Sequence, residues 1–473
     1  MTNNPIERSI VLLADGARSD VFFELLNTGK LPNINKYLVQ NGFATTGVTS
    51  FPSTTGPAYL PFLTGACPST CNIPGIRWFD KTKYANSSCL SLQRYRSYVG
   101  LESFLMSKDI KKGIKTVFEM IPESYSIFNS ITRGARNKTK YMRIWYWYYA
   151  HLTDHWSLAD KAALKKTLQV LNKGCKYLFT VFPGIDEYSH LTHPRSEAAF
   201  ERYIWLDNAI GEIVRLLKRK NQWKSTEIWL VSDHGLSKTD KHFCLNTFLE
   251  QHGLPAFYYP LIFNKKGKLS ASMVSGNGMA HIYLKNKDGW DAKTNYNEIN
   301  QISPSLINDL IKEPAIDIIA CMEAENSIRI MSKKGLAMAK LEANNIISYS
   351  PVKGDPFGYA PMPEKLNHYE LLCKTFSSDY PNAPLELAML FKSSRTGDIV
   401  LSASPGYDLR LKYENPEHKA SHGSLHKSHM LVPILCNRQF KNKIIRTVDI
   451  LPTILKSLNL PVPDNIDGQA LES

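Results

Sequence analysis

Three aspartates in this sequence stand at or just beyond the end of a short apolar run. Asp15 ends "SIVLLAD", Asp186 ends "KYLFTVFPGID", and Asp233 lies within "TEIWLVSDHG". Because these runs are continuously apolar rather than alternating, they predict buried strands of a parallel sheet. Ligands bind beyond the carboxyl ends of such strands, so we expect the three carboxylates to form one site.

Histidines accompany two of these aspartates. His190 follows Asp186 by four residues, and His234 is next to Asp233. Two carboxylates about 4 Å apart repel by about 4 kcal/mol at an effective dielectric constant of about 20, so a cluster of three needs compensating cations. Mixed carboxylate and imidazole ligation suits zinc, with manganese or iron as alternatives, whereas magnesium prefers oxygen ligands alone.

The number of candidate ligands predicts two cations rather than one. Besides the aspartates and their histidines, the segment "KASHGSLHKSHM" supplies a late histidine. Two cations roughly 4 Å apart can activate a nucleophile and stabilise both oxygens of an in-line phosphoryl displacement. No cysteine lies in these motifs, which disfavours a closed structural zinc site.

The hydroxyl to be activated is expected in "SFPSTTGPAYLPFLTG", where Thr54 and Thr55 lie between two prolines and before an apolar, helix-like stretch. One interpretation is an ordinary loop with a capped helix. The other is a threonine nucleophile at a helix N-terminus, where backbone amides face a phosphate. The predicted cations favour the second interpretation.

Helical patterns separate the predicted strands. "SDVFFELLNTGK" offers Ser19 as an N-cap and Gly29 as a stop, and "LPNINKYLVQNG" ends at Gly42. "RYIWLDNAIGEIVRLLKRK" has apolar residues at helical spacing and a basic last turn. A further apolar run of the same kind, "HMLVPILCN", follows the histidine-rich segment and predicts another buried parallel strand. The alternation predicts an α/β fold, a doubly wound and mostly parallel sheet flanked by helices.

Two stretches interrupt this alternation. Residues 246–398 include "SGNGMAHIYLKN", the helix-like "SPSLINDLIK" and "SPVKGDPFGYAPMP". We interpret them as an inserted cap that sets substrate specificity, which leaves 1–245 and 399–473 as the catalytic core. Residues 80–166 are helical and aromatic, as in "YMRIWYWYYAHL", and form either a second insertion or outer helices of the core. An aromatic cluster of this kind is more often core than ligand platform.

Composition restricts the class of protein. The 473 residues suffice for one large domain with insertions or for two or three domains. No run of about 18 apolar residues occurs, and the start lacks the basic and apolar regions of a Sec signal. The eight cysteines are sparse and irregularly spaced, which indicates reduced thiols. We therefore expect a cytoplasmic protein, or one exported without a conventional signal peptide.

The net charge of +14 favours an anionic ligand. The basic residues are scattered, with short clusters such as "KDIKKGIK" and "RLLKRK", and no nucleic-acid module accompanies them. A solvated basic surface is the simpler interpretation of these clusters. The expected partner is a small anionic phosphoester, such as a nucleotide or a lipid headgroup, with small phosphonates as a further alternative. The sequence predicts no oligomeric state.

Five motifs occur in the order "DGAR", "FPSTTGP…TGACP", "DEYSH", "SDHGL" and "SHGS". In this order they resemble the alkaline phosphatase superfamily, and within it the type I phosphodiesterase/nucleotide pyrophosphatase branch. The tail "IIRTVDILPTILKSLNLPVPDNIDGQAL" is similar to the closing helix and loop of sulfatases and phosphomutases. The resemblance covers nearly the whole chain, and residues 246–398 are covered least.

The resemblance implies how the ligands divide between two divalent cations, with zinc preferred and manganese as the alternative. One cation would take Asp15, Thr55, Asp233 and His234, and the other Asp186, His190 and His422. Thr55 matches the family nucleophile because it follows Phe51 by four residues, and Thr54 is the alternative.

His422 is preferred over His426 and His429 because Gly423 follows it, as in the family motif. Of the remaining histidines, His193 is interpreted as a loop residue beside the site. His281 and His418 are interpreted as cap or surface histidines.

One position departs from the family pattern. Nucleotide phosphodiesterases carry an asparagine after the threonine and a proline, and this asparagine donates to a phosphate oxygen. Here the corresponding residue is Ala58, followed by Tyr59, so only the backbone amide of Thr55 remains as a donor. The missing asparagine argues against a nucleotide diester as the substrate more than it argues against the two-metal chemistry.

The implied activity is phosphodiester or nucleotide pyrophosphate hydrolysis by two metals and a phosphothreonine at Thr55. A phosphomonoesterase or phosphomutase on the same fold is the alternative. A sulfatase is disfavoured because Cys67 in "CPSTC" lacks the arginine of the formylglycine motif. A metal-binding protein without catalysis is a third alternative, against which the complete ligand set argues.

Overall fold

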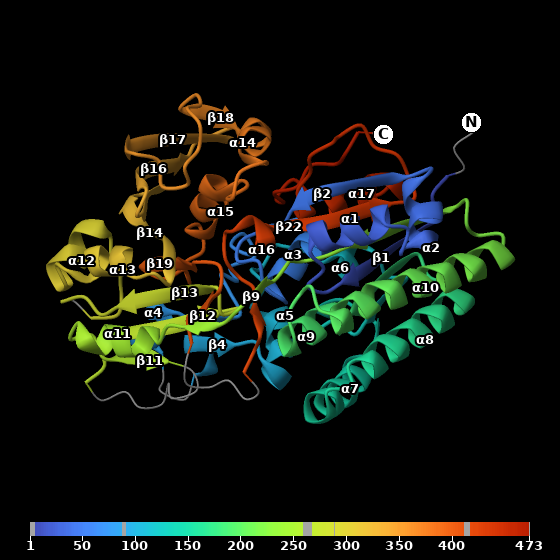
Figure 1. The fold of residues 1–473 in the computed structure, drawn as a ribbon, viewed down its shortest axis with the longest axis horizontal. Coiled ribbons are helices and arrows are strands. Elements are labelled where there is room, and N and C mark those ends of the chain that lie inside the picture. The colour runs from blue at the N-terminus through green and yellow to red at the C-terminus, as the bar shows by residue number, and fades with distance from the viewer. Residues whose placement is uncertain (1–4, 88–90, 259–266, 288, 411–416, 473) are drawn as a thin grey trace.

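The computed structural model describes residues 5–87, 91–258, 267–287, 289–410 and 417–472. Two large sheets lie side by side, each with its own helices (Figure 1). The first has the strand order β2-β22-β8-β1-β7-β5-β6. Its strands are β1 (Arg8–Ala14), β2 (Phe43–Val48), β5 (Ser124–Ile127), β6 (Asn137–Lys138), β7 (Tyr177–Phe182), β8 (Thr226–Val231) and β22 (Leu431–Cys436).

The centre of this first sheet is parallel and buried. β1 pairs with β7 on one side and β8 on the other, and every residue of these three strands is buried. Burial on both faces explains why the sequence is continuously apolar there. The expected fold class, a mostly parallel sheet flanked by helices, is confirmed.

The run "HMLVPILCN" forms β22, which was expected to be a further parallel strand. It pairs antiparallel with both β8 and β2, so this expectation was wrong. The chain reaches β22 from α16 (Lys427–Met430), at the edge where the parallel strands end, and must therefore run in the opposite direction.

The helices begin and end largely where their sequences predict. α10 (Glu197–Arg219) begins after Ser196, whose side chain accepts from the Ala199 amide, and ends in a basic turn. α1 (Ser19–Asn27) stops before Gly29, whose φ of +74° lies in the left-handed region typical of a helix stop. The expected N-cap was wrong by one residue, because Ser19 is the first helical residue and its hydroxyl contacts Thr46.

Residues 31–42 form α2 (Pro32–Ile34) followed by a wider π-helical turn, Asn35–Val39. Two further helices, α8 (Ser157–Lys173) and α7 (Lys140–Thr153), follow α10 outward at one side of the first sheet (Figure 1). Since β5 and β6 lie within 80–166 and extend the first sheet, that part of the stretch belongs to the core.

The aromatic segment of 80–166 is only half buried. On α7, Tyr146 and Trp147 pack against the main hydrophobic core, whereas Trp145 and Tyr149 are exposed. The expectation that this cluster is core therefore holds for one face of the helix and is wrong for the other.

The second sheet has the order β11-β12-β13-β19-β14-β15-β16-β17-β18 and is antiparallel except between β11 and β12. Its strands are β11 (Ala256–Tyr258), β12 (Ser270–Ser275), β13 (Met279–Leu284), β14 (Ile316–Ala324), β15 (Ser327–Ser332), β16 (Gly335–Leu341), β17 (Ile346–Lys353), β18 (Lys365–Asn367) and β19 (Ile399–Ala403). Because β19 pairs between β13 and β14, we place the end of the inserted unit after Ala403 rather than at 398.

Among the described helices, none combines the length and the apolar character needed to cross a bilayer. The cysteines that the structure describes are all free thiols, including Cys67 and Cys71. Cys89 lies outside the described residues.

Candidate metal centre and nucleophile

The three aspartates meet at the carboxyl end of the central parallel strands. Asp15 directly follows β1, and Asp233 lies two residues beyond β8. Asp186 does not end its strand as expected, because β7 stops at Phe182 and α9 (Gly184–Leu191) begins. Asp186 lies in the first turn of α9, and His190 follows one turn later on the same face.

Thr55 lies beside Asp15 and His234, while Asp233 completes a compact group with them. Thr55 Oγ1 is 3.0 Å from His234 Nε2 and 3.3 Å from Asp15 Oδ1. His234 Nε2 is 3.2 Å from Asp233 Oδ2 and 3.5 Å from Asp15 Oδ1. We call these four residues the Thr55 group.

A second set of ligand atoms comes from Asp186, His190 and His422, which we call the His422 group. One ligand atom of each lies within 4.8 Å of the others, and the same holds for Asp15, Asp186 and His234. Asp186 therefore adjoins both groups. His190 Nδ1 lies 2.7 Å from the Ala420 carbonyl oxygen, which orients the ring with Nε2 towards Asp186.

A short ladder brings the distant His422 into the site. β21 (Ala420–Ser421) pairs antiparallel with β9 (Ser237–Lys238), which follows His234 by a few residues. As a result the rings of His234 and His422 stack with their centroids 4.0 Å apart.

The donor set fits divalent cations. Three buried atoms of the two groups have no hydrogen-bond partner among the described residues: Asp186 Oδ1, Asp233 Oδ2 and His422 Nδ1. Buried polar atoms are normally paired, and leaving a carboxylate oxygen unpaired is costly. Their carboxylate and imidazole chemistry suits zinc or manganese.

Burial and mutual repulsion perturb the carboxylates strongly. Burial, and then the Asp186 charge, raise the pKa of Asp15 to about 7. Burial and the neighbouring charges of Asp15 and Asp186 also raise the pKa of Asp233 well above its ordinary value. Without bound cations the cluster must hold protons, and bound cations would replace them.

His190 differs in charge from the other imidazoles of the two groups, because burial also lowers the pKa of His422 well below its ordinary value. Burial lowers the pKa of His234 to about 4, so its ring is neutral near pH 7. Burial also disfavours the charged form of His190, but the Asp186 carboxylate outweighs it and raises the pKa of His190 to about 9. The pKa of Asp186 is in turn held below its ordinary value, mainly by His190, despite burial.

Two side chains that sequence reasoning did not assign to the site lie beside Asp15. The Tyr59 hydroxyl donates to Asp15 Oδ2, and Tyr59 directly follows Ala58, the position that departs from the family pattern. The Arg143 guanidinium on α7 interacts electrostatically with Tyr59 and Asp15. Arg143 stacks over Trp147 at 4.1 Å and donates to the Phe128 carbonyl, so its positive charge is fixed in place.

The turn between β12 and β13 holds the backbone of His422. The His422 amide donates to the Gly276 carbonyl at 3.1 Å, and the Gly278 amide donates to the His422 carbonyl at 2.8 Å. Gly276 has a φ of +60°, and a Cβ there would lie 2.6 Å from His422 Nδ1 and 2.9 Å from Thr54 Oγ1. Position 276 of the segment "SGNGM" therefore requires glycine, because a side chain there would collide with His422 and Thr54.

The alternatives considered for the late ligand are engaged elsewhere, whereas the alternative nucleophile is not. Thr54 Oγ1 is buried and has no hydrogen-bond partner among the described residues. His426 Nδ1 accepts from the Ser428 amide, and His429 lies between the hydroxyls of Ser424 and Ser237 at 2.7 and 2.8 Å.

The remaining histidines fall into three environments. His281 is buried on β13 with Nε2 3.0 Å from the Pro74 carbonyl oxygen, which suits a cap residue. His193 Nδ1 accepts from the Arg195 amide after α9. His418 was expected to be a cap or surface residue, but its ring centroid is 4.4 Å from that of His190, so it lies beside the site.

A family model described as type I phosphodiesterase/nucleotide pyrophosphatase matches residues 9–425. A comparison with curated proteins finds no match. Among solved structures, murine ectonucleotide pyrophosphatase/phosphodiesterase 5 is similar with a TM-score of 0.60 and 13% identity over 98% of both chains. An inactive threonine-to-alanine form of it in complex with AMP gives 0.59 and 12%, over 98% of this chain and 97% of that one.

Phosphonoacetate hydrolase from Sinorhizobium meliloti 1021, in complex with phosphonoformate, is similar with a TM-score of 0.56 and 14% identity over 96% of both chains. At such low identities these neighbours establish the fold alone. The family match extends from the first strand to beyond His422 and thus includes all seven residues of the two groups.

Proposed function

Because the chain belongs to the type I phosphodiesterase/nucleotide pyrophosphatase family, and is therefore a phosphoester hydrolase, we propose that it cleaves small phosphodiesters through a phosphothreonine at Thr55. The contact of Thr55 Oγ1 with both Asp15 and His234 carries this proposal. The solved murine neighbour described as inactive, with a threonine replaced by alanine and AMP bound, supports it.

The Thr55 group and the His422 group would each hold one divalent cation, with zinc preferred because each group includes imidazole. When bound, such cations lower the pKa of a coordinated hydroxyl and offset the charge of the phosphoryl oxygens. The orphaned ligand atoms of Asp186, Asp233 and His422 support this assignment.

The chain's own residues orient the nucleophile. The Thr55 hydroxyl donates to Asp15 Oδ1, and the Tyr59 hydroxyl donates to the other oxygen of the same carboxylate. Attack of Thr55 Oγ1 on phosphorus breaks the bond to the leaving-group oxygen and forms the phosphothreonine. Water then attacks this phosphorus, which restores the threonine and releases a phosphomonoester.

A phosphomonoesterase or phosphomutase is the second candidate, and Ala58 favours it. Ala58 is buried, has no side-chain donor, and its amide already donates to the Thr54 carbonyl at 3.0 Å. The site therefore lacks the donor that nucleotide phosphodiesterases use at this position. Nucleotides and lipid headgroups are the substrate classes that fit the family and the basic charge.

The experiment compares aryl phosphodiesters with aryl phosphomonoesters on the zinc-loaded protein and on two variants. Thr55→Ala should lower diester turnover by more than about thousandfold. Thr54→Val is the matched control, since it removes the neighbouring hydroxyl and should stay within a few-fold of the wild type. Undiminished turnover by Thr55→Ala would refute the covalent mechanism, and a strong monoester preference would favour the second candidate.

A further inference from the structure

An exposed apolar stripe runs along α7. Trp145, Tyr148, Tyr149 and Leu152 recur at spacings of three and four residues and so share one face of the helix. Their exposed fractions are 77%, 44%, 50% and 84%. Large apolar side chains this exposed are uncommon in a group, although single ones are ordinary.

The opposite face of α7 is firmly packed. The ring centroid of Trp147 lies 5.5 Å from that of Trp156 and 5.8 Å from that of Phe128. Arg143, also on α7, stacks on the Trp147 ring. The stripe is therefore presented outward by a well-anchored helix.

The stripe continues onto a neighbouring segment. Val99 and Leu101 are 48% and 55% exposed, and the Tyr148 hydroxyl lies 3.5 Å from where a Cβ on Gly100 would stand. These six side chains make up half of the strongly exposed large apolar residues that the structure describes. We call this set, Val99, Leu101, Trp145, Tyr148, Tyr149 and Leu152, the aromatic patch.

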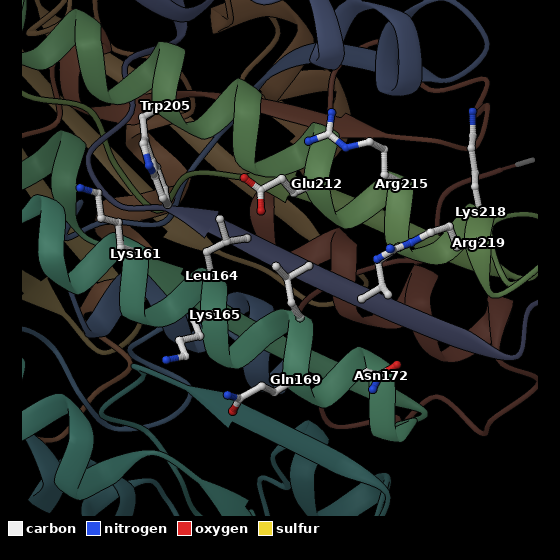
Figure 2. Close-up of a pocket in the computed structure, with 12 residues that line it drawn as sticks. Lys161, Leu164, Lys165, Gln169, Asn172, Trp205, Glu212, Arg215, Lys218 and Arg219 are labelled. Carbon is white, nitrogen blue, oxygen red and sulfur yellow. The ribbon is translucent and has the colours of Figure 1, made fainter.

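Basic side chains follow part of the aromatic patch in the chain and also line a groove on the helices next to α7. The segment "KDIKKGIK" follows Leu101 closely in the chain, and its lysines at 108, 111, 112 and 115 are exposed. The helix α8 lies between α7 and α10 (Figure 1). The groove between α8 and α10 has Lys161 and Lys165 on one wall and Arg215, Lys218 and Arg219 on the other (Figure 2).

We propose that the face formed by α7, α8 and α10 docks on an anionic lipid bilayer. Tryptophan and tyrosine favour the interface between headgroups and acyl chains, and a projecting leucine such as Leu152 gains free energy by inserting there. The lysines and arginines of the groove would bind the acidic headgroups. The chain's net charge of +14 acts in the same direction.

Other occupants fit this face less well. A second copy of the chain would bring one basic surface against another, which is unfavourable. An acidic helix of a protein partner would fill the groove between α8 and α10 but would leave the aromatic patch uncovered. A lipid surface covers both features at once. The docking face also lies near the site, because α7 carries Arg143 on its inner side and Arg143 acts on Asp15.

Vesicle co-sedimentation with the full chain tests this proposal. The protein should bind vesicles of phosphatidylcholine with phosphatidylserine, and should bind vesicles of phosphatidylcholine alone at least about tenfold more weakly. The double variant Trp145→Gln/Leu152→Gln should weaken binding to the anionic vesicles by about tenfold or more. The double variant Lys161→Gln/Lys165→Gln, on α8, should weaken it less, and its deficit should shrink as salt is added.

Tyr369→Gln is the matched control, since Tyr369 is 51% exposed on α14 (His368–Thr375) in the second unit, away from the aromatic patch. This variant should bind vesicles like the wild type. Turnover of a soluble aryl phosphodiester should be unchanged in all variants, which shows that the site is intact. Two results would overturn the proposal: no binding of the wild type to anionic vesicles, or loss of a dimer in solution when Trp145 and Leu152 are replaced.

Discussion

In the Thr55 group, two of the four side chains are attached at the ends of β1 and β8, adjacent strands of the buried first sheet. In the His422 group, Asp186 and His190 come from a helix, and His422 comes from a segment whose backbone is held by the turn of another sheet. The first arrangement depends mainly on the core, with one link to the inserted unit where the Phe51 amide, four residues before Thr55, donates to Glu386. The second also depends on how the inserted unit docks, so the two groups should respond differently to perturbation.

The two groups also differ in which side chains hold protons when no cation is bound. The neutral His234 in the Thr55 group is ready to act as a ligand near pH 7, whereas His190 in the His422 group must lose a proton first. Asp15 and Asp233 of the Thr55 group also hold protons when no cation is bound, so we expect cation binding by both groups to strengthen as pH rises.

The largest effect is expected where the two groups meet. Asp186→Asn removes a carboxylate that adjoins both sets of ligand atoms, so it should lower bound zinc by more than one equivalent and turnover by more than about thousandfold. His422→Asn is the matched comparison and should lower bound zinc by only one equivalent. Metal analysis of the purified variants measures both, and equal losses would remove the distinction between the groups.

The next effect tests the turn that holds His422. Gly276→Ala places a methyl group 2.6 Å from His422 Nδ1 and should weaken the His422 group's cation by about 10- to 100-fold, as changes around metal ligands typically do. Gly253→Ala is the control, because Gly253 has a φ of +71° and no atom within 4 Å of its added Cβ. Zinc titration against a chelator separates them, and identical affinities would show that the turn does not position His422.

Tyr59→Phe perturbs the other group. Loss of the hydroxyl leaves Asp15 Oδ2 without this donor and should lower turnover by about tenfold, with zinc bound by the His422 group unchanged. Steady-state kinetics with an aryl phosphodiester measures the loss. An effect on the His422 group as large as that of Gly276→Ala would contradict the separation of the two groups.

The smallest effect is on the stability of the metal-free protein. Between pH 6.5 and about 8 the folded chain keeps a proton on His190, whose pKa is raised to about 9, while the unfolded chain loses it. The folded state thus binds more protons, and its stability should fall as pH rises, by at most about 1.4 kcal/mol per unit from this group. Asp15, with a pKa of about 7, acts in the same direction at the lower end of this range.

Denaturant unfolding of chelator-treated protein at several pH values measures this slope. His190→Asn should flatten it, because the titrating imidazole is gone. His281→Asn should leave the slope above about pH 7.5 unchanged, since burial lowers the pKa of His281 to about 4 and its imidazole is neutral there in both the folded and the unfolded chain. A slope that is the same in both variants would show that His190 does not hold the extra proton.

The first sheet and its three aspartates could be predicted because strands buried on both faces leave continuous apolar runs. The position of Asp186 on α9 could not be predicted. Its segment "PGID" directly follows the apolar run, so the local pattern predicts the end of a strand, whereas tertiary packing makes it the first turn of a helix. Three other features depend on contacts between segments far apart in the chain. They are the antiparallel direction of β22, the position of His418 beside His190, and the close approach of Gly276 to His422. No local pattern in the sequence encodes them.

The two hydrogen bonds between the β12–β13 turn and His422 tie one ligand of the centre to the folding of the inserted unit. If that unit opens locally while the first sheet stays intact, the His422 group loses its geometry and the Thr55 group keeps its own. Partial denaturation should then release one equivalent of metal before the second, so metal release reports which of the two sheets unfolds first.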